Sequence, residues 1–485
     1  MRTRRGTFLL LSAVVLGTLA AGMALPFVVA DPIPTASGPS GDFGTSPTAF
    51  PTATGVASES PLPGLSPTGL GPVSPGPGGP TTGRPGSPGG PLAVTDRGVT
   101  ASSIKLGVLV PDVAGLSAIN ISVNAGDVEE QFRVYFNRIN AGGGILGRKI
   151  VPVFRTYDLL DESDRNSACI YMTQDQKVFA VFDGGVFLGP PMLCIAQQNR
   201  TPFIRQPGVP DEYAAAAGGY LVTIGPGLQR FDRSFAWELH QSGALKGKRI
   251  GVFGDSYPDS KPGIDAFVAT LKLLGYSITH RTELAINSGT QNAQIPVEVA
   301  EMDRKNVEVV IIMSGATQGP SFVQNAEAQQ YFPTYYVSDH SFSSYDAYAE
   351  RMPQSFDGTI GFTTLRTGEA RAGLPEPAFD AQCRATYNKA TGKNIARGTT
   401  ENQLIMQQCT IVELFQDAAL RAGVTLTRDR LAAAFQALGP VTIANSGRGS
   451  LGPGKLGAGD QIRTVRWSFA CKCYLHVSGF RDLRY

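Results

Sequence analysis

Short apolar runs alternate with amphipathic stretches from Val94 onward. The runs are typical of buried strands and lie at residues 104–110, 149–154, 177–183, 201–206, 249–255, 307–313 and 334–339. Between them apolar residues recur at helical spacing, as at Val128, Phe132 and Phe136, and residues 400–422 carry a long helical pattern. Strands that alternate with helices predict an α/β fold, with parallel sheets covered by helices on both faces.

Glycines in the segment INAGGGILGRKIVPVFRTYD (139–158) have the spacing G-x-G-x-x-G, at Gly142, Gly144 and Gly147. That spacing indicates a dinucleotide loop only where it leaves a strand and opens a helix, because the helix N-terminus must direct its free N–H groups at the pyrophosphate. Here the glycines follow a predicted helix and precede a predicted strand. We therefore expect them to cap the helix and predict no phosphate site.

The N-terminal part of the chain has a different composition. Arg2, Arg4 and Arg5 precede 24 uncharged residues, Thr7 to Ala30, which is typical of a signal peptide or of a membrane anchor. Residues 31–93 contain 15 Pro, 14 Gly and 16 Ser or Thr but only four charges, so they cannot bury enough apolar surface to fold. We therefore expect the protein to be exported and to be extracellular or at the cell surface, in the latter case anchored by residues 7–30. Residues 31–93 would form a disordered tether before the folded part.

Charge and cysteine content narrow the choice of partners. The net charge of +2 and the absence of charged blocks beyond the first residues exclude a nucleic-acid surface. An even set of six cysteines in an exported chain favours disulfides, and zinc is the alternative. Only four histidines are present, and no second C-x-C or C-x-x-C completes a zinc site. We expect no metal and no cofactor.

Three segments together resemble the type I periplasmic binding proteins, in the leucine/isoleucine/valine- and amide-binding branch that serves ABC importers. They read GVTASSIKLGVLVPD (98–112), INAGGGILGRKIVPVFRTYD (139–158) and KGKRIGVFGDSYPDSKPGIDAF (246–267). The resemblance implies two doubly wound parallel-sheet lobes, joined by a three-segment hinge, with the ligand in the cleft. The implied boundaries are 98–226 plus 366–438 for lobe one and 227–365 plus 439–485 for lobe two.

On lobe one, the resemblance implies a ligand site in the loops after the third and fourth strands. The family's amino-acid binders hold the ligand carboxylate there by backbone N–H groups and a Ser or Thr. The corresponding residues are Gly185, Val186 and Phe187, then Gln206 and Pro207, and the first loop, GGVFLGPP, has no hydroxyl. A branched-chain amino acid is therefore not implied, and Phe187 fits the core as well as a cleft wall.

On lobe two, Tyr257 falls on an aromatic position that closes over the ligand in the family. Asp339 falls on an acidic position that pairs with a ligand ammonium, although Asp is also a favoured helix cap. Ser314 and Thr317 edge the same cleft, or cap the helix that follows them.

The implied fold also predicts two disulfides, Cys169–Cys194 and Cys383–Cys409, because each pair then lies on helices that are adjacent in the sheet order. Cys471 and Cys473 share one strand face and would pair with each other only under strain.

These expectations describe a monomeric extracytoplasmic binding protein, not an enzyme. It would deliver a small polar ligand, such as an amino acid, an amide or a related amine, to an ABC transporter permease, and would contact the membrane only through its N-terminal segment. One alternative is a ligand-sensing ectodomain that acts through a separate membrane partner. A minor alternative is a secreted esterase, since GDSY (254–257) is similar to the GDS element of SGNH esterases, but no Asp stands three residues before any histidine.

Overall fold

The computed structural model describes residues 92–113, 124–285, 288–315 and 318–485. The predicted signal peptide or anchor (1–30) and the Pro/Gly-rich linker up to residue 91 lie outside the described residues. In the described part, no helix has both the length and the apolar character needed to cross a membrane.

The first sheet has the strand order β2-β1-β3-β4-β5, and all of its strands are parallel. Its strands are β1 (Ser103–Pro111), β2 (Lys149–Tyr157), β3 (Ala180–Asp183), β4 (Phe203–Arg205) and β5 (Leu221–Thr223). Alternate residues of β1 enter opposite layers: Leu106 and Val108 join one core cluster and Leu109 the other. Both faces of the sheet are therefore buried, as the continuous apolar runs predict.

The second sheet begins as a parallel sheet in the order β7-β6-β8-β9-β10 and continues with antiparallel strands. The parallel strands are β6 (Ile250–Asp255), β7 (Ile278–Leu284), β8 (Val309–Met313), β9 (Thr334–Ser338) and β10 (Ile360–Thr363). The antiparallel strands are β13 (Gln461–Ser468), β14 (Cys473–His476) and β15 (Arg481–Asp482). Every residue of β6 and β8 is buried, so this sheet is also covered on both faces.

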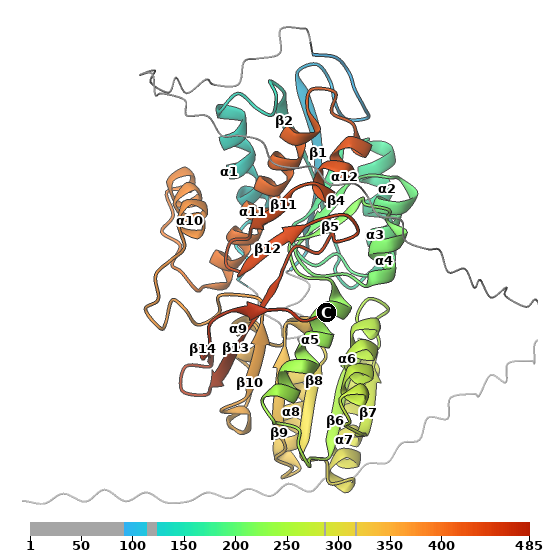
Figure 1. The fold of residues 1–485 in the computed structure, drawn as a ribbon, viewed down its shortest axis with the longest axis vertical. Helices are drawn as coiled ribbons and strands as arrows, with labels where there is room; N and C mark the ends of the chain where they lie inside the picture. The colour runs from blue at the N-terminus through green and yellow to red at the C-terminus, as the bar shows by residue number, and fades with distance from the viewer. Residues whose placement is uncertain (1–91, 114–123, 286–287, 316–317) are drawn as a thin grey trace, which may run out of the picture. The chain divides into compact units, whose positions relative to one another are not determined.

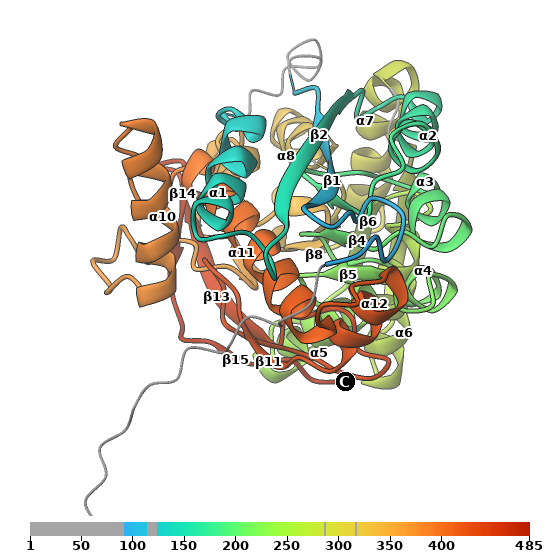
Figure 2. The same cartoon turned by 90° about the horizontal axis from the view of Figure 1, so that it is seen from above.

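Helices cover both sheets. Those of the first lobe are α1 (Val128–Ala141), α2 (Glu162–Ile170), α3 (Pro191–Leu193), α4 (Asp211–Ala216), α10 (Ala378–Thr391), α11 (Thr400–Ala422) and α12 (Arg428–Gln436). Those of the second are α5 (Leu228–Gln241), α6 (Lys261–Leu273), α7 (Ser288–Arg304), α8 (Gln318–Ala328) and α9 (Asp346–Ala349). Figure 1 shows α5 beside α6, where the rings of Phe235 and Phe267 lie 4.9 Å apart. Figure 2 shows α1, α10 and α11 side by side, which brings distant segments into one layer.

The glycine-rich segment ends α1, as its position after a helix predicts. Gly143 has a φ of 103°, the N–H of Gly144 donates to Ile139 O at 2.9 Å and that of Gly143 to Asn140 O at 3.2 Å. This pair of bonds is the Schellman arrangement, which satisfies carbonyl groups at the helix end. A Cβ at Gly144 would lie 2.1 Å from Arg148 O, so only glycine fits there.

The chain passes between the cores of the two lobes three times. The passes run from Ile224 to Phe231, from Phe362 to Cys383 and from Ala458 to Ile462. The implied lobe boundaries place the third pass at residue 439, but in the structure it lies between Ala458 and Ile462. The hairpin of β11 (Gly439–Thr442) and β12 (Arg448–Leu451) precedes it, and Leu451 lies in the core of the first lobe. The chain therefore returns to lobe two at about residue 459, because the apolar residues of 443–458 pack on lobe one.

Disulfides join Cys169 to Cys194 and Cys383 to Cys409, the two pairs that the resemblance implies. The second pair links α10 to α11, with the Cα atoms 5.9 Å apart. Cys471 and Cys473 also pair with each other.

Candidate functional site

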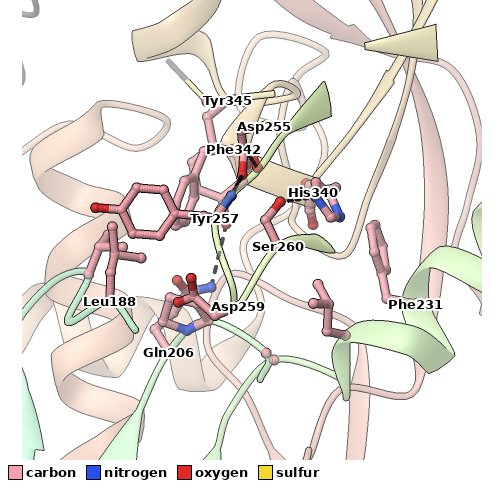
Figure 3. Close-up of a pocket in the computed structure, with 18 of the residues that line it drawn as sticks. Leu188, Gln206, Phe231, Asp255, Tyr257, Asp259, Ser260, His340, Phe342 and Tyr345 are labelled. Carbon is pink, nitrogen blue, oxygen red and sulfur yellow. Dashed lines mark hydrogen bonds between the residues drawn. The ribbon is translucent and has the colours of Figure 1, made fainter. Parts of the chain in front are cut away.

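A cavity of about 210 Å³ lies between the carboxyl ends of the two sheets and is lined from both lobes. Lobe one contributes Leu159, Leu160, Val186, Leu188, Arg205, Gln206, Pro207, Gly208, Gly225 and Pro226. Lobe two and its first helix contribute Leu228, Phe231, Asp255, Tyr257, Asp259, Ser260, Gly315, Asp339, His340, Ser341, Phe342, Tyr345, Tyr348 and Thr364. Figure 3 shows aromatic, aliphatic and acidic side chains converging on this space. Such a mixture is typical of a small-molecule site at the strand ends of α/β sheets.

Five of the residues suggested by the sequence line this cavity: Val186, Gln206, Pro207, Tyr257 and Asp339. Three others do not, namely Gly185, Phe187 and Ser314. Thr317 lies outside the described residues.

Each of these three residues has a structural setting of its own. Phe187 is fully buried in the core, with its ring 5.1 Å from that of Tyr157 and 5.8 Å from that of Phe203. Gly185 packs so closely on β1 that a Cβ would lie 2.5 Å from Pro111 Cγ. Ser314 is buried, and its carbonyl accepts a hydrogen bond from the Ser343 hydroxyl at 3.0 Å.

Asp339 follows β9, and its carboxylate does not cap the next helical turn. It accepts hydrogen bonds from the N–H and the hydroxyl of Thr364, at 2.6 and 2.7 Å, and from the Ser344 hydroxyl. Burial raises the pKa of Asp339, although these three donors oppose the shift. Because the carboxylate bonds to Ser344 and Thr364 and not to an N–H group of the following turn, the interpretation of Asp339 as a helix cap is wrong.

His340, the next residue, forms the centre of a buried hydrogen-bonded array. Its Nδ1 lies 2.8 Å from Asp232 Oδ2 on α5. Its Nε2 lies 2.7 Å from the Ser260 hydroxyl, which Figure 3 shows beside the ring. Burial disfavours the imidazolium, but the carboxylates of Asp232 and Asp255 outweigh it and raise the pKa of His340. The array fixes the ring at the cavity wall and ties α5 to the loops that follow β6 and β9.

Two more carboxylates line the cavity, Asp255 as the last residue of β6 and Asp259 in the loop that follows. Asp255 accepts from the Ser341 hydroxyl at 2.9 Å and from the N–H of Tyr257 at 3.2 Å. Asp259 accepts from the N–H of Gly189 at 3.0 Å, and this bond crosses from lobe two to lobe one. A second, longer contact across the cleft joins Gln206 Nε2 to the Tyr345 hydroxyl at 3.4 Å. The two lobes thus make direct polar contacts at the cavity.

Sequence reasoning missed Asp255, Asp259, Ser260 and His340. A signal for Asp255 was available, because it is an acid at the end of β6, as Asp339 is an acid directly after β9. Parallel strands bring such ends to one edge of the sheet, where ligands bind. Among the described residues, no group of three His, Cys, Asp or Glu side chains is placed to hold a metal ion.

Comparisons with solved structures agree with this architecture. A fatty acid ABC transporter substrate-binding protein from Thermomonospora curvata is 17% identical, with a TM-score of 0.59 over 80% of this chain and 94% of that one. A leucine-binding protein from Thermotoga maritima is 15% identical, with a TM-score of 0.60 over 78% and 99% of the two chains. A solute-binding protein from Rhodopseudomonas palustris, in complex with 3,4-dihydroxy benzoic acid, is also 15% identical, with a TM-score of 0.60 over 79% and 98%.

At this level of identity the structural matches show the fold alone. A search of curated protein sequences found no match. Residues 103–467, most of the chain, match the profile of a family described as periplasmic binding protein. The chain therefore belongs to the periplasmic binding protein family, with the type I fold.

Proposed function

We propose that this protein captures a small polar ligand with an amine or amide group outside the cytoplasm and delivers it to an ABC importer. The observation that carries the proposal is the cavity lined from both lobes, with Tyr257 and Asp339 on one side and Val186, Gln206 and Pro207 on the other. The structural relatives are named for a fatty acid, for leucine and for a benzoic acid, so the fold is compatible with many ligands. The ligand class must be inferred from the side chains.

Ligand capture would stabilise the closed arrangement of the lobes. A ligand between Tyr257 and Gln206 contacts both lobes only when they are closed, and this difference in affinity shifts the population. The bond between Asp259 and Gly189 shows that polar groups of the two lobes reach each other at the cavity. We further propose that residues 1–30 direct export or anchor the chain, and that the chain acts as a monomer.

A hydrolase is the alternative that a specific observation favours, because Ser260, His340 and Asp232 have the bonding order of a serine-hydrolase triad. Two features argue against it. The raised pKa of His340 favours the imidazolium, and this opposes transfer of the serine proton to the ring. The N–H groups after Ser260 donate within their own helical turn, at Lys261, Gly263 and Ile264, so that turn offers no pair of free N–H groups to an oxyanion.

A sensing ectodomain would use the same cleft with a different membrane partner. Permease genes beside this one would favour import, whereas a neighbouring histidine kinase gene would favour sensing.

The test begins with mass spectrometry of small molecules released from the purified protein. Calorimetry with the compound so identified is then compared among the parent, Tyr257→Ala and Asp339→Asn. Asp339→Asn keeps an acceptor for Thr364 but removes the charge, so we expect affinity to fall about ten- to a hundredfold, or about 1.5–3 kcal/mol. Tyr257→Ala removes an aromatic wall and should weaken binding as well.

The matched control is Ser256→Ala, since Ser256 is exposed beside Tyr257 and does not line the cavity. Small-angle scattering should show compaction when the compound binds. Unchanged affinity in both cleft variants, or binding without compaction, would contradict the cleft assignment.

A further inference from the structure

Next to the lining residues Val186 and Arg205, a buried anion-binding arrangement is filled by the protein's own carboxylate. Asp183, at the end of β3, accepts from the N–H of Gly185 at 2.9 Å and from that of Phe187 at 3.0 Å. Arg205 Nε on β4 lies 3.4 Å from Asp183 Oδ2, and both side chains are at most 2% exposed. The two N–H groups are donors with which this loop would otherwise hold an anion, and Asp183 occupies them. The guanidinium of Arg205 is the counter-ion of Asp183.

The other cationic side chain among the described lining residues is also matched by an acid. His340 faces Asp232 through Nδ1 and Ser260 through Nε2. Among the described residues that line the cavity, the side chains of type Arg, Lys or His are those of Arg205 and His340. An incoming carboxylate would therefore meet no described lining cation without its own counter-ion, and would lose hydration without a compensating ion pair.

The same lining carries three carboxylates that form no ion pair with a described Lys or Arg. Asp255 and Asp339 take hydrogen bonds from hydroxyl and N–H groups. The one hydrogen bond described for the Asp259 carboxylate is the one it accepts from the N–H of Gly189. A carboxylate has about four acceptor positions, so this one can accept further hydrogen bonds. A positively charged ligand group among these carboxylates would be attracted to them and would oppose the effect of burial, which raises the pKa of Asp255 and of Asp339. His340 already offsets part of the charge of Asp255, so Asp259 offers the carboxylate with the fewest described partners.

Aromatic rings form part of the wall beside these acids. The rings of Phe342 and Tyr345 lie 5.3 Å apart and those of Phe342 and Tyr348 5.7 Å apart, and Tyr257 lines the cavity as well. Ser341 and Phe342 have φ values of 51° and 65°, a conformation that costs free energy in non-glycine residues and persists only where the surroundings enforce it. Aromatic faces with nearby carboxylates are the recognition chemistry of organic ammonium ions.

The geometry points to a narrower ligand class: an organic cation with an apolar body and no carboxylate, rather than a zwitterionic amino acid. This inference rests on the proposed function, because it assigns the ligand of the same cleft. The ammonium group would lie among Asp255, Asp259 and Asp339, and its apolar part would contact the aromatic wall. Asp183 would deny a ligand carboxylate the two N–H donors of this loop and the guanidinium of Arg205, because it already pairs with them.

The first test compares compounds that differ by a carboxylate, by calorimetry on the full chain. Phenethylamine is compared with phenylalanine, choline with glycine betaine, and benzoate serves as an apolar anion. We expect at least one amine to bind about tenfold or more tightly than its carboxylate partner. Equal or tighter binding of phenylalanine, glycine betaine or benzoate would overturn the inference, and so would the absence of binding by both amines up to about 10 mM.

These outcomes separate the inference from the proposed function. A carboxylate compound that binds, compacts the protein in scattering and depends on Tyr257 leaves the proposed function intact and refutes only the inference. An amine that binds without compaction and without dependence on Tyr257 supports a preference for cations but refutes the cleft.

A second test opens the anion arrangement directly. Asp183→Gly leaves the N–H groups and Arg205 without their carboxylate, so formate or acetate should raise its melting temperature more than that of the parent. Asp183→Asn keeps the shape of the side chain and serves as the control, which should gain less from formate. An equal gain in parent and Asp183→Gly would show that Asp183 does not occupy an anion site. If Asp183→Gly does not fold, the comparison of amines with carboxylates on the parent still decides.

Discussion

Asp380 lies at the start of α10, in the second segment that joins the lobes, and contacts the loop between β11 and β12. Its Oδ2 accepts from the N–H of Asn445 at 3.0 Å and lies 3.9 Å from Arg366 Nε. Burial raises the pKa of Asp380 to about 6, with further repulsion from Glu376 and Glu369, although Asn445 and Arg366 oppose the shift. The folded protein therefore holds the Asp380 proton more tightly than the unfolded chain does.

This shift predicts a loss of stability as the pH rises. The folded pKa is above the unfolded value of 3.8, so the contribution of Asp380 is fully present below about pH 4 and is lost as the pH rises to about 6. The shift corresponds to a change on the order of 2–3 kcal/mol in the free energy of unfolding. Asp380→Asn should flatten the pH dependence in this window, as measured by urea unfolding at several pH values. The control is Asp303→Asn, exposed on α7, and an equal effect of the two variants would contradict the prediction.

At the residue scale, the sequence indicates side chains that directly follow a strand but not those that depend on a distant partner. Tyr257 and Asp339 follow β6 and β9, so a strand prediction already directs them to the sheet edge. His340 depends on Asp232, 108 positions away on α5, and no local spacing reports that contact. From the sequence, Phe187 could lie either in the core or in the wall of the cleft, as any apolar loop residue could. Its packing against Tyr157 and Phe203 places it in the core.

At the scale of elements, the disulfide between α10 and α11 has a large predicted effect on stability. It closes a loop of 26 residues, for which the chain-entropy estimate is about 3.5 kcal/mol. The double variant Cys383→Ala/Cys409→Ala should lose about 2–4 kcal/mol in urea unfolding. The matched control is Cys471→Ala/Cys473→Ala, whose sequence separation of 2 closes almost no loop and predicts a smaller loss. Equal losses would show that packing, rather than loop closure, sets the effect.

Elements with a clear apolar or helical pattern could be predicted from the sequence, and elements without one could not. The helical pattern of residues 400–422 coincides with α11, and the apolar run 307–313 contains β8. In contrast, β5 has three residues, Leu221–Thr223, which are too few to display a period. It is a strand because it pairs with β4 in parallel, from Phe203 opposite Leu221 to Arg205 opposite Thr223.

At the scale of the whole folded part, the two-lobe fold could be predicted but its third crossing could not. Gly457 forms a bridge with Thr223, and a Cβ at Gly457 would lie 2.5 Å from the N–H nitrogen of Gly227. This close backbone approach holds residues 452–458 against the start of the first crossing. The sequence of this stretch contains several glycines and few apolar residues, so its pattern does not indicate which lobe it joins.

The bond between Asp259 and Gly189 allows a test of how the two lobes move. Asp259 lies on lobe two, its Oδ2 accepts from the N–H of Gly189 on lobe one at 3.0 Å, and the bond can form only while the lobes are close. Asp259→Ala should therefore shift the population toward separated lobes, by about 1 kcal/mol for one partly exposed charged hydrogen bond. The ligand-free variant should show a larger radius of gyration in small-angle scattering, and its apparent affinity should fall roughly fivefold or more, because Asp259 also lines the cavity. Ser256→Ala, on the same loop but exposed, should leave both measurements unchanged. An Asp259→Ala protein as compact as the parent would mean that Gly189 and Asp259 meet without stabilising closure, and that other contacts hold the lobes together.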